Sequence, residues 1–158
     1  MGLEMFIIKK TMNVSLDQEK VTTTKFEGFN NVKPNRIMTI QEMIGWWYNF
    51  SPIDNWFYEN VKLPTFNKNR LVLTDDDFDS EFEVSKEDFN NLLVICRTIL
   101  SDNSSSNILL PIPDYEKSLD YDETYFNTIL YSVNFLESII EEMKSDSLFQ
   151  HYYYQSNY

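Results

Sequence analysis

Apolar residues recur at intervals of three and four in the last third of the chain, and this is the clearest periodic pattern in the sequence. The repeat predicts an amphipathic helix of about 20 residues, with apolar positions Tyr125, Phe126, Ile129, Leu130, Val133, Leu136, Ile140 and Met143. Asp122 and Glu123 place negative charge where a helix N-terminus favours it. We therefore expect this helix to begin near Asp122.

A second helical pattern follows Ser85, a favourable N-cap residue, with Asp88 at the capping-box position. Its apolar stripe consists of Phe89, Leu92, Leu93, Cys96, Ile99 and Leu100. Residues 102–107 contain three consecutive serines and are expected to form a loop.

Alternating or β-branched stretches in the remainder predict strands. Residues 5–11 and 20–26 are separated by a polar stretch and read as a hairpin. Residues 70–74 and 81–84 flank the acidic turn 75–80 and predict a second hairpin or two strands of one sheet.

Between these strands, Thr39 and Glu42 have the spacing of a capping box, which predicts a helix over residues 40–50. Pro52 ends that helix and, with Ser51 before it, starts a second helical piece up to about Val61. The expected core positions of the two pieces are Met43, Ile44, Trp47, Phe50, Ile53, Trp56, Phe57 and Val61.

These elements predict the α+β class. We expect residues 1–144 to form a single domain in which a small antiparallel sheet packs against three to four helices. The tyrosine-rich tail, residues 145–158, is expected either to fray or to contact another subunit of a homo-oligomer.

Charge and cysteine content limit the classes of partner and the cellular compartment that we expect. The 158 residues carry 25 acidic and 13 basic side chains, a net charge of -12, which argues against binding duplex DNA or an anionic membrane. A single cysteine and the lack of a basic start followed by a long apolar run favour a reducing cytoplasm.

Candidate catalytic groups are sparse, and we expect a non-enzymatic protein without cofactor or metal. His151 is the only histidine, and the three glycines form no phosphate-binding loop. Cys96 lies on an apolar helix face, as a small core residue would. The acidic run from Asp75 departs from a calcium loop at Ser80 and Lys86, so a solvated turn is favoured.

Aromatic residues are the richest signal. Phe, Tyr and Trp number 12, 10 and 3, more than one small core needs. All three tryptophans lie at positions 46, 47 and 56. Trp46 and Tyr48 fall outside the predicted core stripe, which makes them candidates for the wall of a binding pocket.

Residues 42–57 read Glu-Met-Ile-Gly-Trp-Trp-Tyr-Asn-Phe-Ser-Pro-Ile-Asp-Asn-Trp-Phe. This stretch resembles one shared by a family of small, acidic, uncharacterised proteins of bacteriophage and prophage genomes, approximately Glu-x-Val-Gly-Tyr-Trp-Arg-Lys-Ala-Asn-x-Ile-His-x-Trp-Phe. The matching positions are Glu42, Gly45, Trp47, Ile53, Trp56 and Phe57. The likeness continues at residues 82–85, 92–93, 109–111 and 121–126, and so covers nearly the whole chain.

The polar positions of that stretch differ. Where the family usually has Arg, Lys, Asn and His, this chain has Tyr48, Asn49, Ser51 and Asp54. The Gln-Ser-Gly-rich loop of the family is replaced by residues 112–117. The resemblance implies a common architecture and a phage setting, hence the cytoplasm of an infected host cell, but it does not transfer a site.

Three hypotheses stay open. In the first, a counter-defence protein sequesters a nucleotide-type immune signal in an aromatic pocket, with Trp46, Tyr48, Asn49 and Asn55 as contacts and Arg36 or Arg97 opposite phosphate. In the second, an acidic inhibitor or DNA mimic binds a host defence protein through the carboxylates of residues 75–83, 120–123 and 137–146. The third is a structural or regulatory phage protein that acts as a dimer.

Overall fold

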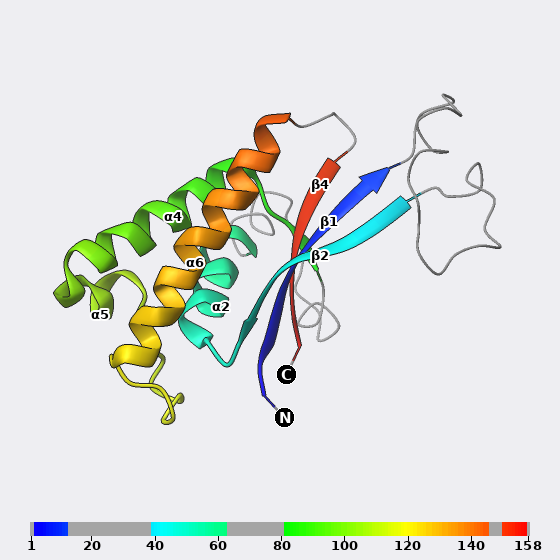
Figure 1. Ribbon diagram of the computed structural model, residues 1–158. Coiled ribbons are helices and arrows are strands. Elements are labelled where there is room, and N and C mark those ends of the chain that lie inside the picture. Colours follow the sequence, from blue (N-terminus) through cyan, green and yellow to red (C-terminus); the bar gives the residue numbers. More distant parts are fainter. Residues whose placement is uncertain (1, 13–38, 63–80, 146–149, 158) are drawn as a thin grey trace.

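The computed structural model describes residues 2–12, 39–62, 81–145 and 150–157 (Figure 1). It confirms a small α+β architecture in which an antiparallel sheet packs against helices. In chain order the main elements are β1 (Glu4–Met12), β2 (Thr39–Tyr48), α2 (Ser51–Phe57), β3 (Phe82–Glu83), α4 (Lys86–Ser101), α5 (Ser106–Leu109), α6 (Glu123–Glu142) and β4 (Gln150–Asn157). A π-helical turn, Tyr58–Lys62, continues α2, and short 3₁₀ turns follow α4 and α6.

The four strands lie in the order β2-β1-β4-β3, and all neighbours are antiparallel. β1 is paired along its length with β2 on one side and with β4 on the other. The sheet therefore has a long edge strand, β2 with 10 residues, and a very short one, β3 with 2.

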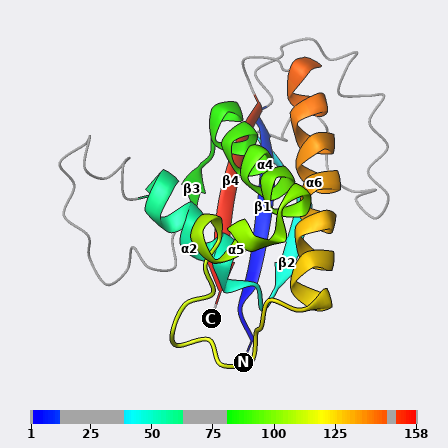
Figure 2. The same cartoon turned by 90° about the vertical axis from the view of Figure 1, so that its left-hand side faces the viewer.

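The helices cover one face of this sheet, with α4 and α6 lying side by side across it (Figures 1 and 2). Successive strand residues point to opposite faces, so only every second residue enters the core. Met5 and Ile7 of β1, Trp47 of β2, and Tyr152 and Tyr154 of β4 are buried against the helices. None of the helices in the described part of the chain is long and apolar enough to span a membrane.

The two long helices begin where their capping residues predict. Ser85 and Asp88 form a reciprocal capping box at the start of α4, and the Asp122 side chain accepts a hydrogen bond from the Tyr125 N–H at the start of α6. Their buried stripes face each other and the sheet, while Arg97 and Glu137 join their outer surfaces with an ion pair of 2.7 Å. Both helix predictions are confirmed.

The predicted helix over residues 40–50 is wrong, because residues 39–48 form strand β2. Local capping signals favoured a helix, but the segment is rich in β-branched and aromatic residues and contains Gly45, which a helix interior disfavours. Pairing with β1 over the whole segment then stabilises a strand in preference to a helix. Accordingly Met43, expected in the core, is 65% exposed. The helix starting at Ser51-Pro52 is confirmed as α2.

Of the two alternatives expected for the tail, fraying is wrong, and contact with another subunit stays a prediction. Residues 150–157 form β4, an interior strand that pairs with both β1 and β3. Tyr152 and Tyr154 alternate with the partly exposed Tyr153, so the tyrosine-rich composition follows the period of a strand with one buried face. The predicted strands at residues 20–26 and 70–74 lie outside the described residues.

Candidate binding surface on the open face of the sheet

The face of the sheet opposite the helices, here called the open face, carries an apolar and aromatic patch. Its members come from three neighbouring strands, and the strand register places them side by side: Phe6 and Ile8 of β1, Met43, Trp46 and Tyr48 of β2, and Tyr153 of β4. Phe6 lies opposite Trp46, and Ile8 lies between Met43 and Tyr153. Side chains far apart in the sequence thus form one surface.

The β2 part of this patch is the most exposed. Met43, Trp46 and Tyr48 expose 65%, 45% and 52% of their surface. The Trp46 and Tyr48 rings lie 6.0 Å apart and are tilted by 33°. Contiguous exposed apolar surface of this kind is typical of an interaction site.

A β-bulge is what holds these three side chains together. The register shifts between Ile7, which pairs with Gly45, and Ile8, which pairs with Met43, so that Ile44 is an extra residue in β2. Met43 and Trp46 are three positions apart and would point to opposite faces of a regular strand. The bulge therefore brings Met43 onto the same face as Trp46.

Charged groups line the β3 side of the open face. Lys10 lies over the Tyr153 ring, 4.5 Å from its centroid, and forms an ion pair with Glu81. His151 Nδ1 lies 2.7 Å from a carboxylate oxygen of Glu83. Lys10 already has a carboxylate partner, and Glu81 and Glu83 together place two carboxylates along this margin.

Of the predicted ligand contacts, only Trp46 and Tyr48 lie on this surface with exposed rings. Asn49 next to them has a structural role: it adopts φ 49°, a left-handed conformation that Asn tolerates. Its N–H donates to the Leu3 carbonyl and its Oδ1 accepts from the Leu3 N–H, both at 2.8 Å. The side-chain oxygen of Asn49 therefore fastens the N-terminal segment.

The remaining predicted contacts are not brought together. Asn55 lies on α2 and accepts a hydrogen bond from the Tyr115 hydroxyl at 3.2 Å. Burial, and then the nearby charge of Asp54, raise the pKa of Tyr115. Arg97 lies on α4, in the helix layer, where it pairs with Glu137. Arg36 lies outside the described residues. The expected pocket combining these groups is thus not formed by the described residues.

Sequence reasoning missed Phe6, Ile8 and Tyr153. The available signal was the run from Met5 to Ile8, which is apolar at every position although the described helices cover only one face of the sheet. Such a run predicts a strand with apolar residues on both faces. The partner strands that complete the patch could not be assigned, because β4 was taken for a tail.

Two polar groups are buried beside the core on α2. The Tyr154 hydroxyl donates to the Asp54 carboxylate at 2.6 Å, and Asp54 is only 5% exposed. Ser51 Oγ is buried and has no hydrogen-bond partner among the described residues. The expectation that Cys96 is a core residue is confirmed: it is fully buried, and burial raises the pKa of its thiol to about 12.

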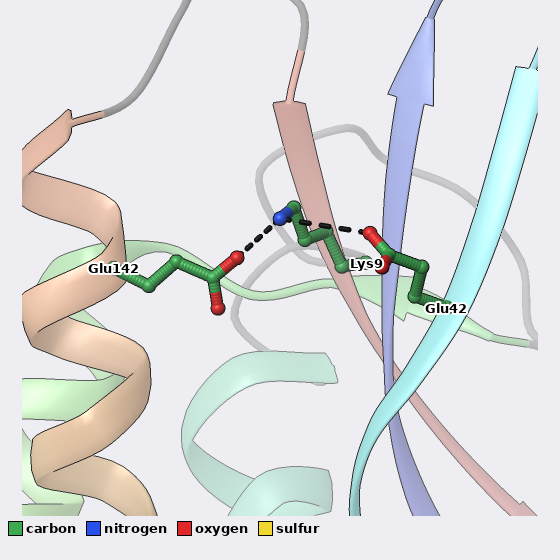
Figure 3. Close-up of polar contacts among 3 residues, drawn as sticks. All are labelled: Lys9, Glu42 and Glu142. Atoms are coloured by element: carbon green, nitrogen blue, oxygen red, sulfur yellow. Dashed lines mark hydrogen bonds and ion pairs between the residues drawn. The ribbon is translucent and has the colours of Figure 1, made fainter. Parts of the chain in front are cut away.

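An ion-pair cluster joins the sheet to the end of α6 (Figure 3). Lys9 of β1 bonds to Glu142 of α6 and lies 3.6 Å from a carboxylate oxygen of Glu42 on β2. Burial by itself lowers the pKa of Lys9, but the hydrogen bonds and charges of the two glutamates outweigh it and raise the pKa. The cluster thus favours the charged amine.

No group of three or more potential metal ligands occurs within the described ranges. A scan against protein-family models found no match, and searches of curated proteins and of solved structures found no similar protein. The described residues form an α+β fold in which helices cover one face of the sheet and aromatic side chains are exposed on the other.

Proposed function

We propose that this chain is a non-enzymatic inhibitor that binds a basic surface of a partner protein through the open face of its sheet. The observation that carries the proposal is the exposed pair Trp46 and Tyr48 on a contiguous apolar surface. The resemblance to phage proteins favours a counter-defence role in an infected cell, with a host defence protein as the partner.

The shape of the surface favours a macromolecular partner. Small-molecule sites are typically concave and enclose most of their ligand, whereas Trp46 and Tyr48 project from the face of a sheet. Aromatic residues and methionine are enriched at protein interfaces, and tryptophan and tyrosine are frequent among the residues that dominate binding energy.

Charge supports a basic partner. The net charge of -12 steers cationic surfaces toward the chain. Glu4 lies beside Tyr48 in the register, and Glu81 and Glu83 border the opposite side of the patch. Arginine and lysine side chains of a partner can stack on the exposed rings while pairing with the exposed Glu4 carboxylate beside Tyr48. A protein groove that normally holds nucleic acid has this chemistry.

Sequestration of a nucleotide-type ligand is the second candidate, favoured by one observation. The Trp46 and Tyr48 rings, 6.0 Å apart, offer a platform on which a base can stack. Phosphate recognition is the weak point, since Lys10 is paired with Glu81 and Arg97 with Glu137. We therefore rank it below protein binding.

The test compares wild type with a Trp46→Ala/Tyr48→Ala variant and a control, Val94→Ala/Ile108→Ala, which removes exposed apolar side chains from the helix layer. Each immobilised protein is incubated with host lysate at low and high salt, and retained proteins are identified by mass spectrometry. We expect a basic protein to be retained at low salt by wild type and control, and to be lost with the open-face variant.

Equal retention by the open-face variant, or no retained protein at all, would contradict the proposal. Calorimetry with cyclic and ADP-ribose-type nucleotides completes the test. Heat released with wild type but not with the Trp46→Ala/Tyr48→Ala variant would replace protein binding by nucleotide sequestration.

A further inference from the structure

We propose that the outer edge of β2 pairs with the same edge of a second copy of this chain, so that two four-stranded sheets join into one. This inference goes beyond the proposed function, because it concerns the edge of the sheet and needs no other partner. The reasons are the position of β2, the weak protection of its edge by the described residues and the distribution of charge.

β2 is the terminal strand in the sheet order, and among the described residues only β1 pairs with it. Its 10 residues leave a row of backbone N–H and C=O groups on the outer side. One of these groups, the Trp46 carbonyl, accepts a hydrogen bond from the Tyr131 hydroxyl of α6 at 3.1 Å. The stretch from Thr39 to Ile44 is the part of the edge beyond this contact.

Natural sheets protect such edges with lysine, proline or very short strands. β3, the strand at the other edge, is protected by its shortness, because it has only 2 residues. β2 has neither lysine nor proline, and its protection within the described residues is the bulge at Ile44, the single charge of Glu42 and the Tyr131 contact at Trp46. A long strand rich in β-branched and aromatic residues with so few protective features is a template for pairing with another strand.

Charge indicates that the other strand belongs to a second copy. Two chains of net charge -12 repel each other over most surfaces. β2 carries only one ionisable acidic side chain, Glu42, and that carboxylate lies beside Lys9. The edge is thus the place where two acidic copies can approach, whereas it offers a basic partner little charge.

Antiparallel pairing of β2 with itself forms a twofold dimer in which the same residues face each other. The open faces of the two copies then lie in one continuous surface. Met43, 65% exposed in the single chain, lies within the paired stretch, so its side chain would be flanked by side chains of the second copy.

Light scattering coupled to size exclusion measures the mass over a range of concentrations. We expect twice the 18.9 kDa of one chain for the wild type. Met43→Lys places a new charge in the paired stretch and should weaken the dimer at least tenfold. Val94→Lys adds the same charge at a similarly exposed position of α4, 61% against 65%, and should leave the mass unchanged.

Cross-linking locates the contact independently of any effect on folding. Since the native Cys96 is buried with a raised thiol pKa, a cysteine introduced at the surface is the reactive one. A short bis-maleimide should join two Met43→Cys chains and should not join two Val94→Cys chains.

A single-chain mass for the wild type at all concentrations would overturn the proposal, as would equal dimerisation of Met43→Lys or equal cross-linking at both cysteine positions. Failure here is distinguishable from failure of partner binding, because the mass is measured without lysate. The Trp46→Ala/Tyr48→Ala variant should still dimerise.

Discussion

Trp46 and Trp47 are neighbours in the chain, yet they belong to opposite sides of the molecule. Trp47 is 2% exposed, donates its indole N–H to Ser132 of α6 at 2.8 Å and meets the Phe135 ring edge-on, with centroids 5.1 Å apart. Trp46 is 45% exposed, and its ring lies 6.0 Å from that of Tyr48. The helix-covered face therefore holds the fold together, whereas the open face carries exposed aromatic rings.

Contacts between aromatic rings also distinguish the covered face from the open face. On the covered face Phe57 stacks on Tyr154 at 4.2 Å and meets Trp56 and Phe89 edge-on. Such contacts add to the free energy gained by burial. Substitutions on the covered face should consequently lower stability, whereas substitutions on the open face should affect binding and change stability little.

The matched tryptophans provide the strongest test. Trp47→Ala removes a buried ring and leaves a cavity, which should lower the free energy of unfolding by about 3–5 kcal/mol. Trp46→Ala should lower it by about 1 kcal/mol or less, because the ring is half exposed. Urea denaturation measures both values. Similar losses for the two variants would remove the distinction between the faces.

Gly45 tests how closely the covered face is packed. A Cβ at this position would overlap the Phe135 ring, which is held between Trp47 and Tyr131. Gly45→Ala should therefore destabilise the protein by about 2–3 kcal/mol through overpacking.

A double-mutant cycle with Phe135→Leu isolates that contact. The smaller side chain makes room for the new methyl group, so the combined loss should be less than the sum of the single losses. Additive losses would mean that the Gly45 effect arises elsewhere.

The buried hydroxyl of Tyr154 should have an intermediate effect. Tyr154→Phe removes its hydrogen bond to the Asp54 carboxylate and should lower stability by about 2 kcal/mol. Tyr153→Phe is the matched control on the open face and should change stability by less than about 0.5 kcal/mol. Thermal unfolding of the two variants compares them, and a larger loss for Tyr153→Phe would reverse the assignment of faces.

The Lys9 cluster should give the smallest effect, and one that depends on pH. Because the folded-state pKa of Lys9 lies above its unfolded value, its contribution is fully present below about pH 10 and declines as the pH rises through the folded pKa. Lys9→Met should cost about 1 kcal/mol at neutral pH. The difference from wild type should shrink at high pH, as urea denaturation from pH 7 to 11 would show. A difference that does not change with pH would contradict this account.

The elements predicted well are those whose signals are local. α4 and α6 have both a capping side chain within three residues of their start and an apolar stripe of helical period. For β2 the local signals were misleading: Thr39 and Glu42 have capping-box spacing, but β1 offers pairing along the whole segment. Strand formation depends on partners distant in sequence, and a capping motif cannot report them.

For the candidate binding surface, the sequence singled out Trp46 and Tyr48 as rings outside the core, and both are exposed. It could not associate them with Phe6 and Tyr153, since that requires the register of three strands and the position of a bulge. Arg97 and Asn55 were grouped with them by residue type alone, and they lie in the helix layer.

The sequence by itself determined the α+β class, the two long helices, the start of α2 and the acidic character of the surface. These follow from periodicity, caps and composition, which act over a few residues or over the whole chain. Only the tertiary structure decided that residues 39–48 and 150–157 are strands and which side of each strand faces the helices. The physical reason is that a strand is stabilised by neighbours far away in the chain, and a single extra residue in β2 determines which side chains share a face.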